Sequence, residues 1–126
     1  STPPELDSNS FYQDARKIIG ERFQELFVVH TKEFNIDFQT NSNFNKDLKT
    51  AITFLEIDDF EAGYQMIKDM AAQDYKKSKS KSSALYNLAM MQMFNDELDL
   101  SLENAKKAYM LDSRNKDCLE IIEKLK

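Results

Sequence analysis

A fixed spacing of 38 residues in the second part of the chain restricts its fold more than any other feature. Four pairs of residues share this spacing, namely Ala51 and Ala89, Phe60 and Leu98, Gly63 and Ser101, and Met70 and Ala108. Repetition at a fixed period is typical of stacked helical hairpins, and small residues allow antiparallel helices to approach closely. We therefore predict two helical hairpins, at residues 45–75 and 83–112, followed by a C-terminal capping helix that ends the domain at residue 126.

The composition fits a single, mainly α-helical domain. The chain has 126 residues with only two Gly and two Pro, whereas all-β folds need many turn residues. Its formal net charge of −5 argues against nucleic acid and anionic membranes as partners, because both attract a basic surface. No apolar run approaches the roughly 20 residues of a membrane span, so none is predicted. The opening Ser1-Thr2-Pro3-Pro4 suggests a mature or shortened form, with any export signal already removed.

Residues 1–8 are polar and are predicted to form a flexible lead-in, followed by a helix and a strand within residues 9–44. The helix is predicted from apolar residues at helical spacing, which are Phe11, Ala15, Ile18, Ile19, Phe23, Leu26 and Phe27. The strand is predicted over residues 33–39, because Phe34, Ile36 and Phe38 alternate with polar residues.

A lone strand leaves its own backbone N–H and C=O groups without hydrogen-bond partners. Two outcomes are expected for residues 33–39: pairing with their copy in a homodimer, or exposure as the remnant of a larger sheet. A third arrangement, in which Val28 and Val29 fold back to pair with the strand, is less compatible with a helix that ends at Phe27.

The residues needed for common catalytic and metal sites are scarce. His30 and Cys118 are the only His and Cys, so a zinc site of these residue types cannot be built within one chain. No phosphate-binding or dinucleotide-binding Gly motif is present. The acids of residues 56–61 are interpreted as a turn before a helix, and the Lys and Ser residues of 76–83 as a solvated connector. We predict no enzymatic activity, no cofactor and no metal.

The second hairpin resembles a tetratricopeptide repeat (TPR). The residues that carry the resemblance are Leu85, Leu88, Ala89, Leu98, Ser101 and Ala108. Ser113 stands where this family usually has Pro, and Gln92 where it usually has an aromatic residue. The hairpin at 45–75 resembles a weaker copy, with four residues added to the nominal 34-residue repeat. The resemblance implies a TPR-like array of two repeats plus capping helices, with one short N-terminal strand.

In TPR arrays the first helices of the hairpins, the A helices, line a concave face that binds a peptide or a partner helix. The residues of this chain at matching positions are Asn45, Lys49, Ile52, Tyr86, Asn87, Met90, Met93, Glu120 and Ile121. The resemblance therefore implies a protein-interaction module that uses these residues. Of the residues that clamp a partner's carboxylate in chaperone-binding members, only Asn87 is matched. Most Met residues are expected to fill the core.

A narrower similarity concerns the C-terminal repeat region of Gram-negative envelope lipoproteins, in which a pair of repeats follows an α/β domain. The order of a helix, a strand and a repeat pair carries this similarity. It implies an alternative function, a structural module of an envelope lipoprotein or assembly factor, and a periplasmic or envelope-associated location.

Overall fold

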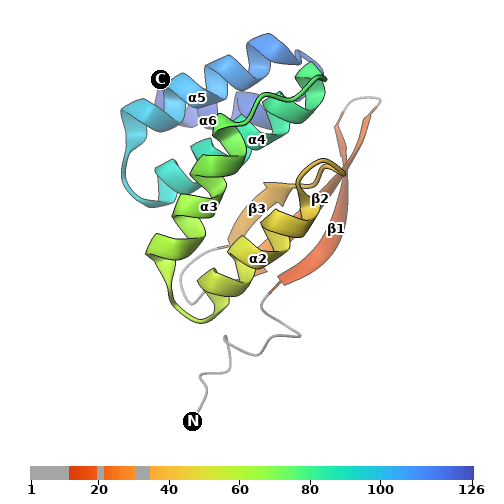
Figure 1. Ribbon diagram of the computed structural model, residues 1–126. Coiled ribbons are helices and arrows are strands. Elements are labelled where there is room, and N and C mark those ends of the chain that lie inside the picture. Colours follow the sequence, from red (N-terminus) through yellow and green to blue (C-terminus); the bar gives the residue numbers. More distant parts are fainter. Residues whose placement is uncertain (1–11, 20–21, 31–34) are drawn as a thin grey trace.

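The computed structural model describes residues 12–19, 22–30 and 35–126, and this part of the chain is mainly helical (Figure 1). Three strands form one sheet: β1 Tyr12–Ile19, β2 Arg22–His30 and β3 Asn35–Gln39. Five helices follow: α2 Asn45–Glu56, α3 Phe60–Ala72, α4 Ser78–Phe94, α5 Leu98–Leu111 and α6 Asp117–Leu125. Each helix packs against the next along the chain, and the sheet lies beside the helices rather than among them. The predicted lead-in at residues 1–8 lies outside the described residues.

The predicted helix between Phe11 and Phe27 is wrong, because this segment forms an antiparallel hairpin. β1 pairs with β2 from Tyr12 opposite Val29 to Ile19 opposite Arg22. Aromatic and β-branched residues favour strands, and the hairpin supplies the backbone partner that β3 requires. The strand preference of these residues and the pairing with β3 together outweigh the helical spacing of the apolar residues.

The predicted strand is confirmed at Asn35–Gln39, and its pairing partner lies in the same chain. β3 pairs antiparallel with β2, so that Ile36 is opposite Val29 and Phe38 is opposite Phe27. The arrangement in which Val28 and Val29 fold back onto the strand is therefore the correct one. One edge of β3 is already paired with β2 within the chain, and nothing in the structure supports a homodimer through residues 33–39.

One continuous core joins the sheet to the helices. Phe27, Val29, Ile36 and Phe38 are buried on the sheet and belong to the same apolar cluster as residues of all five helices. The fully buried large side chains of the helices include Leu48, Ile52, Ile67 and Met91. Burying each such side chain stabilises the fold by roughly 1.5–3 kcal/mol relative to leaving it exposed.

The first helical hairpin, α2–α3, and the second, α4–α5, are equivalent at the expected spacing. Each hairpin turns at an Asp with a positive φ, 66° at Asp58 and 61° at Asp96. Gly63 lies close to α2, where an added Cβ would be 3.0 Å from the Ala51 carbonyl oxygen. At the matching place, the Ser101 hydroxyl donates to the carbonyl of Ala89 at 2.6 Å. The repeat detected in the sequence therefore corresponds to a repeated contact between helices.

Residues 76–83 are not a connector throughout, because α4 begins at Ser78. The serines at 80, 82 and 83 are buried among the helices, and the Ser82 hydroxyl donates to the Ala108 carbonyl at 2.6 Å. These contacts outweigh the modest helix propensity of Ser. The second hairpin thus starts five residues earlier than predicted.

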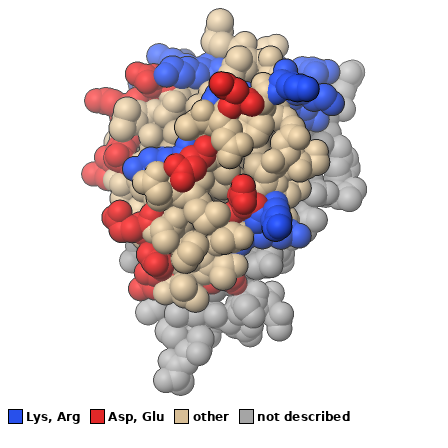
Figure 2. All heavy atoms as spheres, in the orientation of Figure 1, with Lys and Arg blue, Asp and Glu red and all other residues tan. Residues whose placement is uncertain are grey.

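The acids of residues 56–61 behave as interpreted. The Asp59 carboxylate accepts a hydrogen bond from the Ala62 N–H at 3.2 Å and so caps α3. On the face seen in Figure 2, acidic side chains gather along the edge where the α2–α3 and α4–α5 turns lie. Lys and Arg side chains lie in separate groups on this face.

Candidate functional site

Asn87 joins helix α4 to the sheet through its side-chain amide. Its Oδ1 accepts a hydrogen bond from the backbone N–H of Gln39 at 2.7 Å, and its Nδ2 donates to the Gln39 carbonyl at 2.9 Å. Asn87 is only 2% exposed. The amide thus takes the place that the peptide group of a neighbouring strand would occupy beside β3. Asn87, the one residue expected to contact a partner's carboxylate if the chain resembled chaperone-binding TPR proteins, thus binds a segment of its own chain.

The Gln39 side chain extends this junction into a buried polar network. Its Nε2 donates to Asn115 Oδ1 at 2.6 Å and to Asp117 Oδ2 at 3.1 Å, and its Oε1 accepts from Asn115 Nδ2 at 3.0 Å. Asn115 Nδ2 also donates to the Ser82 hydroxyl at 3.0 Å. Strand β3 is therefore fixed to α4, to the turn between α5 and α6, and to the start of α6. Sequence reasoning missed this network because it treated Ser82 and Asn115 as parts of breaks.

The nine predicted site residues divide into two groups in space. The three on α2 lie away from the others. The Asn45 Oδ1 accepts from the Asn41 N–H at 2.6 Å, Ile52 is fully buried, and the Lys49 ammonium is 5.8 Å from the centre of the Phe27 ring. The other group comes from α4 and α6. Five of its members line one small hollow, and they are Tyr86, Met90, Met93, Glu120 and Ile121.

This hollow, which we call the α4–α6 hollow, has a volume of about 130 Å³. Its lining is completed by residues that sequence reasoning did not select, namely Asp37, Phe94, Asp117 and Lys124. Asp37 comes from β3, so its place here depends on the docking of that strand on α4. No signal in the sequence identified that docking.

The α4–α6 hollow has a mostly polar accessible surface, and its lining carries more acidic than basic side chains. Tyr86, Met90 and Ile121 are buried, whereas Met93 is half-buried and Glu120 is exposed. Burial raises the pKa of the Tyr86 hydroxyl well above its usual value, and the charges of Asp117 and Asp37 raise it further. The Tyr86 hydroxyl therefore stays protonated throughout the physiological pH range. The hollow is suited to holding a partner side chain that carries polar atoms.

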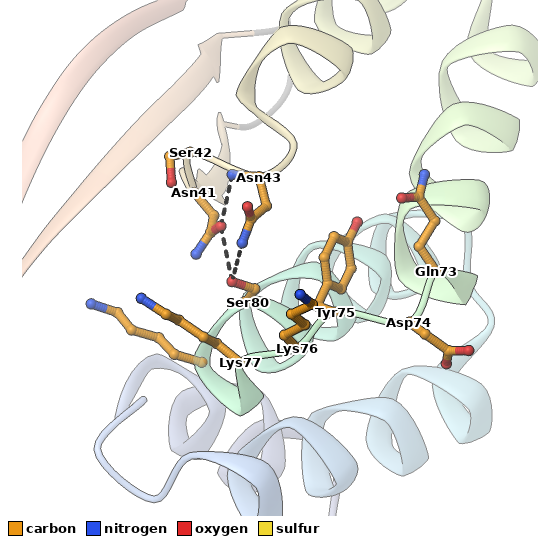
Figure 3. Close-up of a pocket in the computed structure, with 10 residues that line it drawn as sticks. Asn41, Ser42, Asn43, Gln73, Asp74, Tyr75, Lys76, Lys77 and Ser80 are labelled. Atoms are coloured by element: carbon orange, nitrogen blue, oxygen red, sulfur yellow. Dashed lines mark hydrogen bonds between the residues drawn. The ribbon is translucent and has the colours of Figure 1, made fainter.

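A second, larger pocket lies where α4 begins (Figure 3). It has a volume of about 600 Å³ and is lined by Asn41, Ser42, Asn43, Gln73, Asp74, Tyr75, Lys76, Lys77, Lys79 and Ser80. Ser80 Oγ donates to Asn41 Oδ1 at 3.1 Å and accepts from Asn43 Nδ2 at 2.8 Å. Figure 3 shows these three side chains meeting, while Gln73 and Asp74 point away from them. Their hydrogen bonds hold the β3–α2 turn on α4, which is a structural task.

No protein-family model matches the sequence, and no curated protein or solved structure shows significant similarity to it. The resemblances to TPR proteins and to envelope lipoproteins therefore stay predictions. Among the described residues, no helix has both the length and the apolar character to cross a membrane. Within the same ranges, no three His, Cys, Asp or Glu side chains come together in a way that suits a metal ion.

Proposed function

We propose that this chain is a non-enzymatic protein-interaction module, built on a TPR-like array of the hairpins α2–α3 and α4–α5, that binds an extended peptide at the α4–α6 hollow. The observation that carries this proposal is the convergence of five of the predicted residues, from α4 and the last helix α6, on one hollow. The equivalent turns at Asp58 and Asp96 support the array.

The size of the hollow supports a peptide rather than a small-molecule substrate. Sites for substrates and cofactors usually enclose about 300–1,000 Å³. A cavity of roughly 150 Å³ holds a benzene-sized group, so about 130 Å³ suits one side chain of a partner. Aromatic and Met residues are well suited to this task, because rings and flexible thioethers make large apolar contacts.

The neighbourhood of β3 supports an extended partner. β3 is the outer strand of the described sheet on the side of α4, and Asp37 of this strand forms part of the hollow. A peptide lying along this edge places alternate side chains toward the hollow, as in other cases of strand addition. Asn87 already fills the place beside Gln39, so a partner would lie toward the Asp37 end of the strand.

A peptide-display library selected on the immobilised protein tests the proposal. We expect enriched peptides whose binding weakens at least about tenfold, or about 1.4 kcal/mol, in Met93→Lys and Glu120→Lys variants. Glu61→Lys is the matched control, since Glu61 is an exposed acid on α3 outside the hollow. Glu120 and Glu61 are exposed, so their variants should keep the wild-type melting temperature, whereas Met93 packs against the core and a thermal melt must show that Met93→Lys is folded before its binding is compared. Peptides that bind both hollow variants as tightly as the wild type would refute the proposed site.

A further inference from the structure

A different surface, on the other side of α4, exposes apolar side chains to solvent. Met110 and Leu111, in the last turn of α5, are 83% and 41% exposed. Together with Leu85 of α4 they line a shallow hollow of about 580 Å³, which we call the α4–α5 hollow. Exposed Met and Leu side chains that share one depression mark an interaction surface more often than isolated exposed residues do.

The rim of the α4–α5 hollow is positively charged although the whole chain carries −5. Lys81, Lys106 and Lys107 lie on the rim with a single acid, Glu103. The Lys107 ammonium is 3.3 Å from the Glu103 carboxylate. The Lys81 ammonium donates to the Gln73 carbonyl at 2.8 Å and also to the Ala71 carbonyl, so its charge is directed toward the end of α3. A partner that covers the hollow therefore meets a rim of net positive charge, mainly at Lys106 and Lys107 on α5.

The chemistry of the lining selects the conformation of the partner. Apolar atoms make up almost the whole inner surface of the hollow. An extended segment laid there would lose water from its N–H and C=O groups without gaining hydrogen bonds, which is costly. A helix satisfies those groups internally and can present an apolar stripe to Met110 and Leu85.

From these observations we infer that the α4–α5 hollow binds an amphipathic helix of a second protein, with its apolar stripe against Leu85, Met110 and Leu111 and acidic residues beside Lys106 and Lys107. This surface is separate from the α4–α6 hollow and does not depend on the function proposed for it. Opposite charges at the rim would set the orientation of the helix and speed its association.

Two other occupants fit the surface less well. In a symmetric dimer the same patch meets itself, which would bring Lys106 and Lys107 of one copy toward those of the other. An anionic membrane would attract the lysines, but the net charge of −5 repels the rest of the chain from it. A depression also offers less to a bilayer than a protruding apolar wedge does.

Selection from a display library of helix-forming peptides on the immobilised full chain tests the inference. We expect enriched sequences with apolar residues at helical spacing flanked by Glu and Asp. A selected peptide should bind at least about tenfold more weakly to Met110→Glu and to the double variant Lys106→Glu, Lys107→Glu. Binding should also weaken as salt is raised. Lys46→Glu, at an exposed position of α2 outside both hollows, is the matched control and should leave the affinity unchanged.

Several results would overturn the inference. Selected helices without an acidic bias, or with full affinity for Met110→Glu, would show that the hollow does not recognise them as described. Light scattering that shows a wild-type dimer and a Met110→Glu monomer would assign the patch to a second copy. Flotation with phosphatidylserine vesicles that is lost in Met110→Glu would assign it to a membrane. Met110 is exposed, so its replacement leaves the core intact and each result can be interpreted.

Discussion

Replacement of Asn87 with Leu tests the junction between the sheet and the helices. Leu is branched at Cγ like Asn but carries two larger methyl groups in place of the polar atoms, so it removes both hydrogen bonds to Gln39 without opening space for water. Because Gln39 is fully buried, its N–H and C=O groups would be left without these partners. The unfolded state, in contrast, is hydrated at both groups and is little affected by the substitution.

The expected loss follows from the two bonds. Each contributes roughly 0.5–1.5 kcal/mol net, and a buried polar group that loses its partner costs about 1–3 kcal/mol. Relaxation of the strand recovers part of this cost, so we expect the free energy of unfolding to fall by about 2–4 kcal/mol. With a urea m-value of about 2 kcal/mol/M, the middle of the usual range, the midpoint should fall by roughly 1–2 M.

Urea denaturation and native-state hydrogen exchange measure the effect together. The Gln39 amide should lose its protection selectively, because its acceptor is the Asn87 side chain. Asn104→Leu is the matched control, since Asn104 is also buried but donates to the Gln92 side chain at 2.8 Å. In Asn104→Leu, the Gln39 amide should exchange at the wild-type rate, and the urea midpoint should fall less than in Asn87→Leu. Equal Gln39 protection in Asn87→Leu and the wild type would refute the junction.

Two further predictions concern the hairpins. Burial, followed by the hydrogen bond to Glu97, raises the pKa of Tyr64 to about 12 from its usual 10.0. The unfolded state then loses the proton first, so this stabilisation is complete below pH 10 and is lost between pH 10 and 12. Tyr64→Phe should reduce the change in the free energy of unfolding over this pH range by about 2 kcal/mol relative to the wild type. The same change in both proteins would contradict the assignment. Gly63→Ala should destabilise the fold by about 1–2 kcal/mol, although Ala has the better helix propensity. The reason is that the new Cβ would be 2.9 Å from the Leu55 side chain and 3.0 Å from the Ala51 carbonyl oxygen. A raised urea midpoint would show that α2 and α3 are not in close contact.

The helical part of the fold could be predicted because its signal is repeated. The spacing between Gly63 and Ser101 places each beside the same position of its partner helix, so two independent segments report one geometry. Residues 12–30 offer a single copy, and their apolar residues satisfy a helical period. Whether such a segment becomes a helix or a hairpin depends on β3, which needs a backbone partner, and this need is visible only in the folded chain.

The candidate site shows the same limit. The repeat pattern selected the face of α4 that carries Tyr86, Asn87 and Met90, but it could not say what lies against that face. β3 covers part of it and binds Asn87, so an expected ligand contact became a contact within the chain. Met110 shows the converse, since core filling is the usual role of a Met at helical spacing and this one is exposed. A sequence pattern reports which side of a helix is apolar, whereas the partner on that side is decided by distant segments.

Helix α4 makes two separate recognition surfaces physically possible. At about 100° per residue, Lys81 and Leu85 lie roughly 130° around the helix from Tyr86, Met90 and Met93. The first pair belongs to the α4–α5 hollow and the second set to the α4–α6 hollow. The two hollows share no lining residue. The α4–α5 hollow is apolar and suits a helix, whereas the α4–α6 hollow lies beside β3 and suits an extended segment. Two partners of different secondary structure could therefore bind together, and a substitution in one hollow should leave binding at the other unchanged.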